Sequence, residues 1–274
     1  MYKFSVLMSV YKDENPEYLS KALESILKQT LLPDEIVIVE DGLLTEDLYK
    51  ILSQYAEQCS MIKRISFAQN RGLGLALHDG VLACQNKWIA RMDTDDIAKP
   101  ERFQKQMLFL QQHPDIALLG TGIEEFSENE DKPDSVTLLP TNHKKILEFA
   151  KRRNPFRHMT VIFRKEAVLE SGNYRHFLWF EDYDLWVRML IRGFKSANLP
   201  EVLVSVRANP AMFARRGGWK YLKQDIRFQI LLYEEHFIGL MVFLENVGMR
   251  GIVRLIPNML RIKFYQRFLR SERK

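Results

Sequence analysis

The sequence predicts an α/β protein whose mostly parallel sheet is flanked by helices and followed by a helical, basic C-terminal tail. The sheet is predicted because short apolar runs alternate four times with segments of helical periodicity, joined by short links. The tail is predicted by a basic, amphipathic stretch at the end of the chain. The 274 residues are 46% hydrophobic and 27% charged, which is typical of a soluble globular protein with a substantial core.

The first part of the chain alternates strand and helix in order. Residues 4–10 form a short apolar run that indicates a buried strand. Residues 15–30 carry apolar side chains at helical spacing, and Pro16 suits the first helical turn. The next predicted elements are strands at 35–40, 61–72 and 87–93, and helices at 45–58 and 73–85. This order is typical of βαβ units, so we expect a parallel sheet covered on both faces.

The pattern changes after Pro100. The expected elements are helices at 101–113, 143–153 and 181–193, a strand at 115–126, a polar turn at 127–135, and a strand with a short helix within 159–172. The two cysteines, Cys59 and Cys84, lie in apolar-patterned segments and form no Cys/His cluster, so we expect reduced thiols in a cytosolic protein rather than zinc ligands. The first residues lack the pattern of a signal peptide.

The net charge of +5 is unevenly distributed. Residues 246–274 hold eight Lys or Arg and one Glu, a charge of +7, so the rest of the chain carries −2, since +5 less +7 is −2. No nucleic-acid-binding motif is present, and we expect no nucleic-acid partner. A basic, apolar tail points first to an anionic membrane surface.

The tail is amphipathic between residues 250 and 262. Its basic face carries Arg250, Arg254 and Arg261, and its apolar face carries Ile252, Leu255, Ile256 and Met259. Pro257 either kinks this helix or begins a second one. Two interpretations stay open, a helix packed on the rest of the protein and a monotopic membrane contact, of which we favour the second. The longest apolar run nearby, residues 237–244, is too short for a span of about 20 residues.

Polar residues follow the ends of the predicted strands. These residues are Tyr11 and Lys12, Glu40 and Asp41, Asn70 and Arg71, and finally Asp93, Asp95 and Asp96. Parallel sheets bind ligands at the carboxyl ends of their strands, so we expect the site at this edge. The last three carboxylates suit Mg²⁺ or Mn²⁺, which would neutralise a diphosphate as it leaves. Taken alone, the cluster is equally compatible with a solvated acidic turn before a helix.

Five segments, in order, resemble the inverting nucleotide-sugar glycosyltransferases of family two, which have the Rossmann-like GT-A fold. The segments are "FSVLMSVYKDENPEYLSKALESILKQTLLPDEIVIVEDG", "NRGLGLALHDG", "WIARMDTDDIAKPERF", "FRHMTVIFRKEAVLESGNYR" and "WFEDYDLWVRMLIRG", within residues 3–207. The resemblance is strongest to bacterial O-antigen and capsule enzymes that add a β-1,3-linked hexose from UDP-Gal or UDP-Glc to GlcNAc-diphosphoundecaprenol. Five ordered motifs are far more specific than any one of them.

The resemblance implies roles for the strand-end residues. The implied nucleotide-binding residues are Tyr11, Asp41, Arg71 and Asp93, and the implied metal ligands are Asp95, the principal one, and Asp93, with Asp96 as an orienting neighbour. A carboxylate at position 41 can accept the N3–H of uracil, although an Asp-Gly turn explains it equally well. The alternative for Arg71 is a surface salt bridge.

The resemblance also places the acceptor-side chemistry. Asp182 would be the general base that takes the proton of the acceptor hydroxyl, and Glu181 would help to place the acceptor. The alternative, a helix cap at Asp182, is compatible with this role because a helix N-terminus favours an ionised carboxylate. The loop that holds a His in many relatives has none here, so the diphosphate falls to Arg207, Arg215 or Arg216. We expect His158 to be structural.

These implications define the expected protein. Residues 1–218 would form the GT-A catalytic domain, with a nucleotide-binding half at about 1–98 and an acceptor half at about 99–218, and residues 219–274 a helical extension. The enzyme would use Mn²⁺ or Mg²⁺, a UDP-sugar and an undecaprenyl-diphosphate-linked acceptor, peripherally on the cytoplasmic face of the bacterial inner membrane. The alternatives are a haloacid-dehalogenase-type phosphotransfer enzyme, whose Asp-x-Asp normally follows the first strand, and a non-catalytic membrane-associated scaffold.

Overall fold

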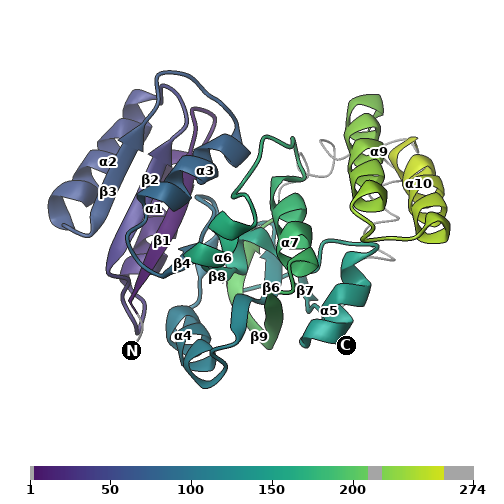
Figure 1. Ribbon diagram of the computed structural model, residues 1–274. Coiled ribbons are helices and arrows are strands. Elements are labelled where there is room, and N and C mark those ends of the chain that lie inside the picture. Colours follow the sequence, from purple (N-terminus) through teal and green to yellow (C-terminus); the bar gives the residue numbers. More distant parts are fainter. Residues whose placement is uncertain (1–2, 209–217, 256–274) are drawn as a thin grey trace.

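A nine-stranded sheet organises the protein, and a computed structural model describes its residues 3–208 and 218–255 (Figure 1). The strands are β1 (Phe4–Val10), β2 (Glu35–Glu40), β3 (Ile62–Ser66), β4 (Trp88–Arg91), β5 (Ile97–Ala98), β6 (Ile116–Phe126), β7 (Ser135–Thr137), β8 (Ile162–Arg164) and β9 (Lys195–Arg207). The helices are α1 (Pro16–Leu27), α2 (Glu46–Gln58), α3 (Leu73–Ala83), α4 (Arg102–Gln112), α5 (His143–Ala150), α6 (Lys165–Glu170), α7 (Glu181–Ile191), α9 (Trp219–Glu234) and α10 (Leu240–Leu255), with a 3₁₀ turn, η1 (His158–Thr160).

The sheet order is β3-β2-β1-β4-β8-β6-β9-β5, and β7 pairs with β6 beside this path. Strands β1 to β4 are mutually parallel, β6 runs parallel to β9, and the remaining pairs are antiparallel. The predicted α/β fold with a mostly parallel sheet is therefore confirmed. Because β1 to β4 all end at one edge, their following loops meet there.

Both faces of the sheet are covered, as Figure 1 shows. In β1, Val6 and Met8 pack into a core that includes α1, α2 and α4, whereas Leu7 packs into a second core that includes α3, α6 and α7. This alternation follows from the two-residue period of a strand. A parallel strand with helices on both sides must be apolar throughout, which explains why residues 4–10 lack polar alternation.

Helix α3 approaches the sheet unusually closely at Gly80. A Cβ atom added to Gly80 would lie 2.4 Å from a Leu7 methyl carbon and 3.0 Å from a Val39 methyl carbon. Only a residue without a side chain lets the helix backbone sit this close to β1 and β2. The first turn of α3 is thereby held beside the ends of these strands.

Several elements differ from the sequence expectations. The predicted strand at 61–72 is confined to β3, and the long strand β9 was not predicted from periodicity. Strand β9 contains Pro200, and its pairing with β6 shifts register near Gly122, so no regular alternation marks it. The short strands β5 and β7 were also missed because they offer too few residues for a period to be seen.

The C-terminal helices α9 and α10 pack beside α7. An apolar cluster joins Phe180 and Tyr183 to Tyr221 and Phe228 of α9, and Phe243 of α10 packs against it. In the described part of the chain, no helix combines the length and hydropathy needed to cross a membrane. Arg215, Arg216 and the tail beyond Leu255 lie outside the described residues.

Gly80→Ala tests the close approach of α3. We expect the variant to lose about 1–3 kcal/mol of unfolding free energy, because the new methyl group overpacks the contact with Leu7 and Val39. Gly248→Ala on α10 is the matched control, because an added Cβ there meets nothing within 4 Å and helix propensity favours Ala by about 1 kcal/mol. Urea unfolding measures both, and an unchanged midpoint for Gly80→Ala would contradict the packing.

Candidate active site

A cavity of about 350 Å³ opens where β1, β2 and β4 end and α3 begins. It is lined by Ser9, Tyr11, Glu14, Asp41, Asn70, Gly72, Leu73, Arg91, Asp93, Thr94 and Asp95. Four predicted site residues, Tyr11, Asp41, Asp93 and Asp95, therefore share one cavity although they come from three separate strand ends. A cavity of this size with several convergent polar groups is typical of a small-molecule site.

Asp41 holds the loop that leads into α3. Its Oδ1 accepts the backbone N–H of Arg71 at 2.8 Å, and its Oδ2 accepts that of Gly72 at 2.9 Å. Gly42 adopts φ +92°, and a Cβ there would lie 2.6 Å from the Asn70 nitrogen, so this position requires glycine. The Asp-Gly turn exists, and each carboxylate oxygen of Asp41 keeps a further lone pair for a ligand.

Arg71 follows this loop, but its side chain is engaged beside the cavity. One guanidinium nitrogen lies 2.5 Å from a carboxylate oxygen of Asp79, and the guanidinium carbon lies 3.7 Å from the centre of the Phe67 ring. The salt bridge weighed from the sequence is thus present. Contact between Arg71 and a nucleotide remains a proposal.

The three aspartates of the acidic cluster have different surroundings. Asp93 pairs with the buried guanidinium of Arg91. Burial, followed by the charge of Asp93, raises the pKa of Asp95 to about 6. Asp96 is fully buried and accepts the backbone N–H of Arg207 at 3.0 Å, and burial raises the pKa of its carboxyl well above the usual value. Asp96 therefore ties β9 to this loop, while Asp93 and Asp95 line the cavity.

Glu14 is a further carboxylate of the site that sequence reasoning missed. It lines the cavity, and burial, together with the charges of Asp95 and Asp93, raises its pKa to about 7. A hydrogen bond from the Thr94 side chain acts in the opposite direction. The one sequence feature that pointed to Glu14 as a site residue is its position soon after the first strand. The same segment, however, indicated only the start of a helix at Asn15 and Pro16.

The carboxylates at the strand ends are candidate ligands for a metal ion. Within residues 3–208 and 218–255, no three His, Cys, Asp or Glu side chains converge closely enough to hold a metal ion by themselves. Asp93 and Asp95 nevertheless supply carboxylate oxygens beside one cavity, and their mutual repulsion would be relieved by a cation. Mg²⁺ is commonly held by one or two carboxylates plus substrate phosphates, so this donor set fits a cation shared with a diphosphate.

The predicted catalytic pair begins helix α7. The Asn154 side-chain amide donates a 2.7 Å hydrogen bond to Asp182 Oδ2, and Asp182 Oδ1 accepts the Tyr183 N–H at 2.7 Å. Glu181 lies against the first turn of α3. A Cβ atom added to Gly74 would be 3.3 Å from the Cβ atom of Glu181. The structure thus places Glu181 beside α3, whose first residue, Leu73, lines the cavity, and Asp182 follows Glu181 in the chain.

Burial, followed by the charge of Asp182, raises the pKa of Glu181 to about 7. The charge of Asp93 acts in the same direction, which shows that the strand-end carboxylates and the α7 pair lie within electrostatic range of each other. Perturbed carboxyl pKa values from two separate elements are typical of a functional site.

Arg207 lies at the β9 side of the acidic cluster. Its guanidinium carbon is 3.8 Å from the centre of the Tyr18 ring and 4.7 Å from that of Phe126. Its Nε and Nη2 atoms are buried without a hydrogen-bond partner among the described residues. The positive charge of Arg207 lowers the pKa of Asp95, so it acts on the carboxylate that faces the cavity.

His158 belongs to the core. Its Nε2 atom lies 2.9 Å from the hydroxyl oxygen of Tyr174, and its ring packs edge-on against Trp186. Burial lowers the pKa of His158 well below its usual value, so the ring is neutral. The structural role expected for this histidine agrees with these contacts.

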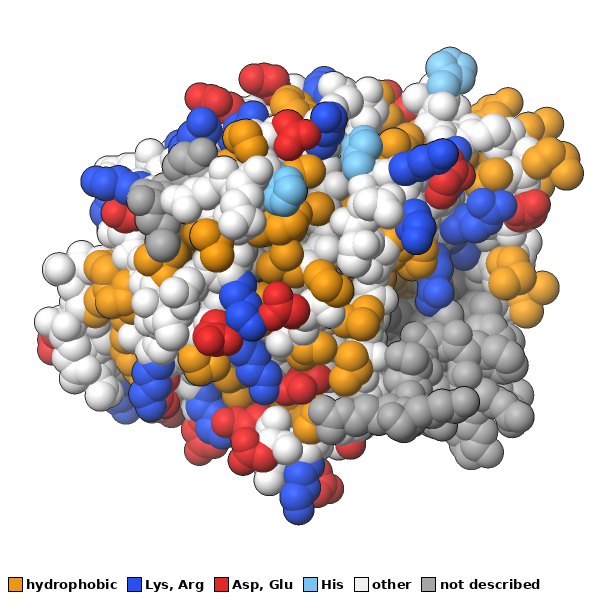
Figure 2. Space-filling view, turned by 90° about the horizontal axis from the view of Figure 1, so that it is seen from below, with side chains coloured by type: hydrophobic (Ala, Val, Ile, Leu, Met, Phe, Trp, Pro, Cys, Tyr) orange, Lys and Arg blue, Asp and Glu red, His pale blue; other side chains and the backbone are white. Residues whose placement is uncertain are grey.

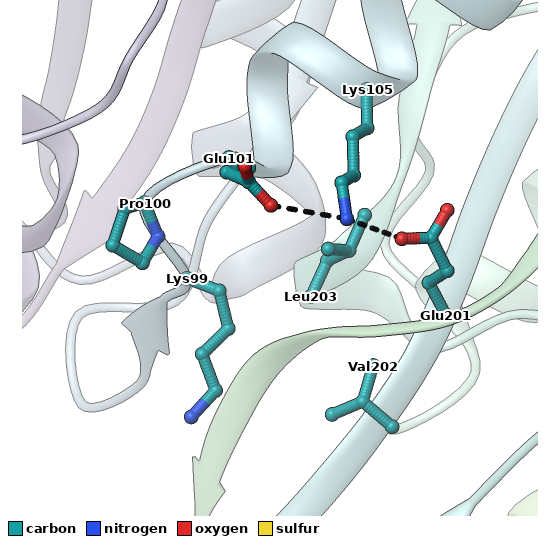
Figure 3. A pocket seen from close by; sticks show the side chains of 7 residues that line it. All are labelled: Lys99, Pro100, Glu101, Lys105, Glu201, Val202 and Leu203. Atoms are coloured by element: carbon teal, nitrogen blue, oxygen red, sulfur yellow. Dashed lines mark hydrogen bonds and ion pairs between the residues drawn. The ribbon is translucent and has the colours of Figure 1, made fainter.

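A larger and more open hollow, about 550 Å³, lies on another part of the surface (Figure 3). Lys105 points between Glu101 and Glu201, at 3.1 and 2.5 Å, and Lys99 pairs with Glu124 at 2.6 Å. Because these charges satisfy one another, the hollow offers no group for chemistry. The candidate active site is therefore the smaller cavity with its converging carboxylates.

Sequence comparison now defines the class of protein. Residues 5–172 match the family model described as glycosyl transferase family 2, and the chain belongs to this family. It is 40% identical over 275 residues to the amylovoran biosynthesis glycosyltransferase AmsE of Erwinia amylovora, covering 99% of each chain. It is 35% identical over 268 residues to the UDP-Gal:α-D-GlcNAc-diphosphoundecaprenol β-1,3-galactosyltransferase of Escherichia coli, covering 98% of this chain and 97% of that one.

Solved structures show the same GT-A fold. S. aureus TarS 1–349 in complex with UDP-GlcNAc aligns with a TM-score of 0.65 at 16% identity, over 83% of this chain and 66% of that one. The mannosyltransferase PcManGT from Pyrobaculum calidifontis, in complex with GDP-Man and Mn²⁺, aligns with a TM-score of 0.64 at 12% identity. The alignment covers 96% of this chain and 72% of that one. The chain spans 43% of a longer TarS structure. The phosphotransfer and scaffold alternatives find no support.

Glu181→Gln tests the raised pKa of this carboxyl. The folded state holds the Glu181 proton more tightly than the unfolded chain, so its contribution to stability is complete below pH 4.5 and is lost as the pH rises to about 7. Gln cannot ionise, so we expect the stability of the variant relative to the native protein to increase across this window. Urea unfolding at pH 4.5 and 7.5, without divalent cations, measures the difference.

Glu57→Gln, a change at an exposed glutamate on α2, is the control for loss of a surface charge. It should show no comparable increase. A constant difference between the Glu181→Gln and native proteins at both pH values would show that the Glu181 carboxyl titrates normally.

Proposed function

We propose that this glycosyltransferase moves a hexose, galactose or glucose, from a UDP-sugar to a lipid-linked sugar with inversion at the anomeric carbon. The proposed acceptor is GlcNAc-diphosphoundecaprenol, with a β-1,3 linkage, in O-antigen or related surface polysaccharide assembly at the cytoplasmic face of the bacterial inner membrane. The geometry that carries the proposal is the convergence of strand-end carboxylates on one cavity, with the α7 pair near enough for the charge of Asp93 to raise the pKa of Glu181. The similarity to the galactosyltransferase of E. coli supports the substrates.

The nucleotide would bind at the ends of β1 and β2. Asp41 has lone pairs left to accept the N3–H of uracil, and the loop that it fixes is already in place before binding. Tyr11 lines the same cavity, and Asp93 would contact the ribose or the metal. Arg71 would lie by the base or diphosphate. To bind either group, its side chain would have to leave the salt bridge with Asp79.

The diphosphate would lie by Asp95 and Asp93. Mn²⁺ or Mg²⁺, held by these two carboxylates, would supply neutralisation of the departing UDP. Arg207 adds a positive charge from β9, and its Nε and Nη2 atoms, which have no partner within residues 3–208 and 218–255, suit phosphate oxygens. By sequence position, Arg215 and Arg216 would extend this basic contact. Glu14 faces the same region and would help to orient the cation or a donor hydroxyl.

Asp182 would accept the proton of the acceptor hydroxyl as its oxygen attacks the anomeric carbon. The new C–O bond forms while the bond to the UDP oxygen breaks, so the proton ends on Asp182 and the electron pair on UDP. Asn154 and the α7 N-terminus hold the Asp182 carboxylate in one orientation. Glu181 takes up a proton more readily than an ordinary glutamate, and in that form it donates a hydrogen bond to the acceptor.

Asp182→Asn tests the base. We expect transfer to fall by about 10²–10⁴-fold, because the amide cannot take the hydroxyl proton. The affinity for UDP should stay within about twofold by calorimetry, because Asp182 lies at α7 and not at the strand ends. Asp115→Asn, on the surface and paired with Lys195, is the matched control. Turnover that survives in Asp182→Asn would show that another group is the base.

Asp95→Asn tests the metal. We expect Mn²⁺-dependent UDP-sugar binding to weaken by about tenfold or more, on the scale of one lost charged contact. Titrating UDP-sugar into the protein with and without Mn²⁺ separates this loss from a general defect. Asp131→Asn, at an exposed loop, is the control. Full transfer activity in the presence of EDTA would rule out the metal role of Asp95 and Asp93.

A further inference from the structure

Helix α10 turns an apolar face to solvent. Its exposed large apolar side chains are Leu240, Met241, Leu244, Met249 and Ile252, between 54% and 70% exposed. The exposed Glu245 lies between Met241 and Met249 and pairs with Arg152 at 2.8 Å. In Figure 2, hydrophobic side chains gather at the edge of the molecule where α9 and α10 lie. A surface helix normally buries such a stripe, and a row of exposed large apolar side chains marks an interaction surface.

The opposite face of α10 is fixed to the rest of the protein by the apolar packing of Val242 and Phe243 and by polar contacts. The Asn246 amide donates 2.8 Å hydrogen bonds to the Lys151 carbonyl and to Gln229 Oε1. Arg250 donates 2.6 Å hydrogen bonds to Asp225 Oδ1 and to the Arg152 carbonyl. Asp225 is fully buried, so these contacts leave the helix no freedom to turn its apolar face inward. The basic face expected at Arg250 therefore points into the protein.

The chain that continues from α10 is strongly basic. Residues 246–274 carry a net charge of +7, of which the charge of Arg250 is paired with Asp225. An apolar helical stripe joined to such a segment has the composition of a helix that lies in the plane of a bilayer surface. Each basic residue near an anionic surface is attracted to it, whereas two copies of this chain meeting here would bring two like-charged segments together.

We propose that the apolar face formed by Leu240, Met241, Leu244, Met249 and Ile252 docks this protein on an anionic lipid bilayer. The face inserts between headgroups, and the net charge of +7 on residues 246–274 favours an acidic lipid surface. The exposed apolar side chains of α10 have a direct reason in this case. One face of the helix packs on the protein, and the other binds the membrane.

The docking face is connected to the proposed base. Helix α10 binds the carbonyls of Lys151 and Arg152, and Asn154, two residues later, donates to Asp182. A bilayer under α10 would therefore lie at a fixed position relative to the acceptor side of the site. This consequence rests on the proposed function, because it matters only when the acceptor is lipid-linked.

Vesicle sedimentation of the full-length protein tests the docking face. We expect the native protein to sediment with vesicles that contain phosphatidylglycerol, and more weakly with pure phosphatidylcholine. Leu244→Glu should weaken the partition by about tenfold or more, the factor expected for removing one buried leucine from the interface. Leu108→Glu is the matched control, because Leu108 is similarly exposed, at 48%, on α4. It should bind vesicles like the native protein.

Transfer assays separate this inference from the proposed function. Leu244→Glu and Leu108→Glu should both transfer normally to a short-chain, water-soluble acceptor, whereas Leu244→Glu alone should fail on a long-chain acceptor embedded in vesicles. Equal vesicle binding by the native and Leu244→Glu proteins would overturn the docking face. Light scattering gives a second test. The docking face would also be overturned if the native protein is a dimer and Leu244→Glu dissociates the dimer without changing vesicle binding. Normal vesicle results with no transfer to either acceptor would uphold docking and reject the proposed function.

Discussion

The close packing of α3 between the sheet and the segment that leads into α7 is the contact on which the site depends. Gly80 lets the helix lie directly on Leu7 and Val39, and Gly74 does the same toward the Arg175 carbonyl and Glu181. These contacts bring the first turn of α3 to the strand ends on one side and to the α7 carboxylates on the other. A larger side chain at either glycine would separate the two halves of the site.

The site concentrates negative charge at a cost in stability. Glu14, Asp95 and Glu181 all have raised pKa values, in each case chiefly because burial removes the carboxyl from water. Arg91 and Arg207 offset only part of this repulsion. Folding alone gives no reason to gather these groups, whereas the proposed cation would relieve their repulsion. The apolar core around β1 to β4 is buried from water, and the free energy of this burial offsets the cost of gathering the carboxylates.

The C-terminal helices share an apolar cluster with the start of α7. Phe228 and Tyr221 of α9 pack on Phe180 and Tyr183 at the start of α7, and α10 is tied to the chain just before Asn154. Membrane docking through α10 would therefore act on the same elements that hold the acceptor-side carboxylates. The hydrogen bonds of Asn246 and Arg250, with the packing of Phe243, determine which side of α10 faces the protein.

The sequence by itself determined the parallel half of the sheet, the family, and the placing of Asp41 and Asp95 at strand ends, because strand and helix periods are local properties. Only the tertiary structure decided that Glu14 joins them, since that contact crosses about eighty residues of chain. It also decided which face of α10 is buried. A helical period reports that two faces differ, but the buried partner of Arg250, Asp225, belongs to another helix and leaves no mark on that period.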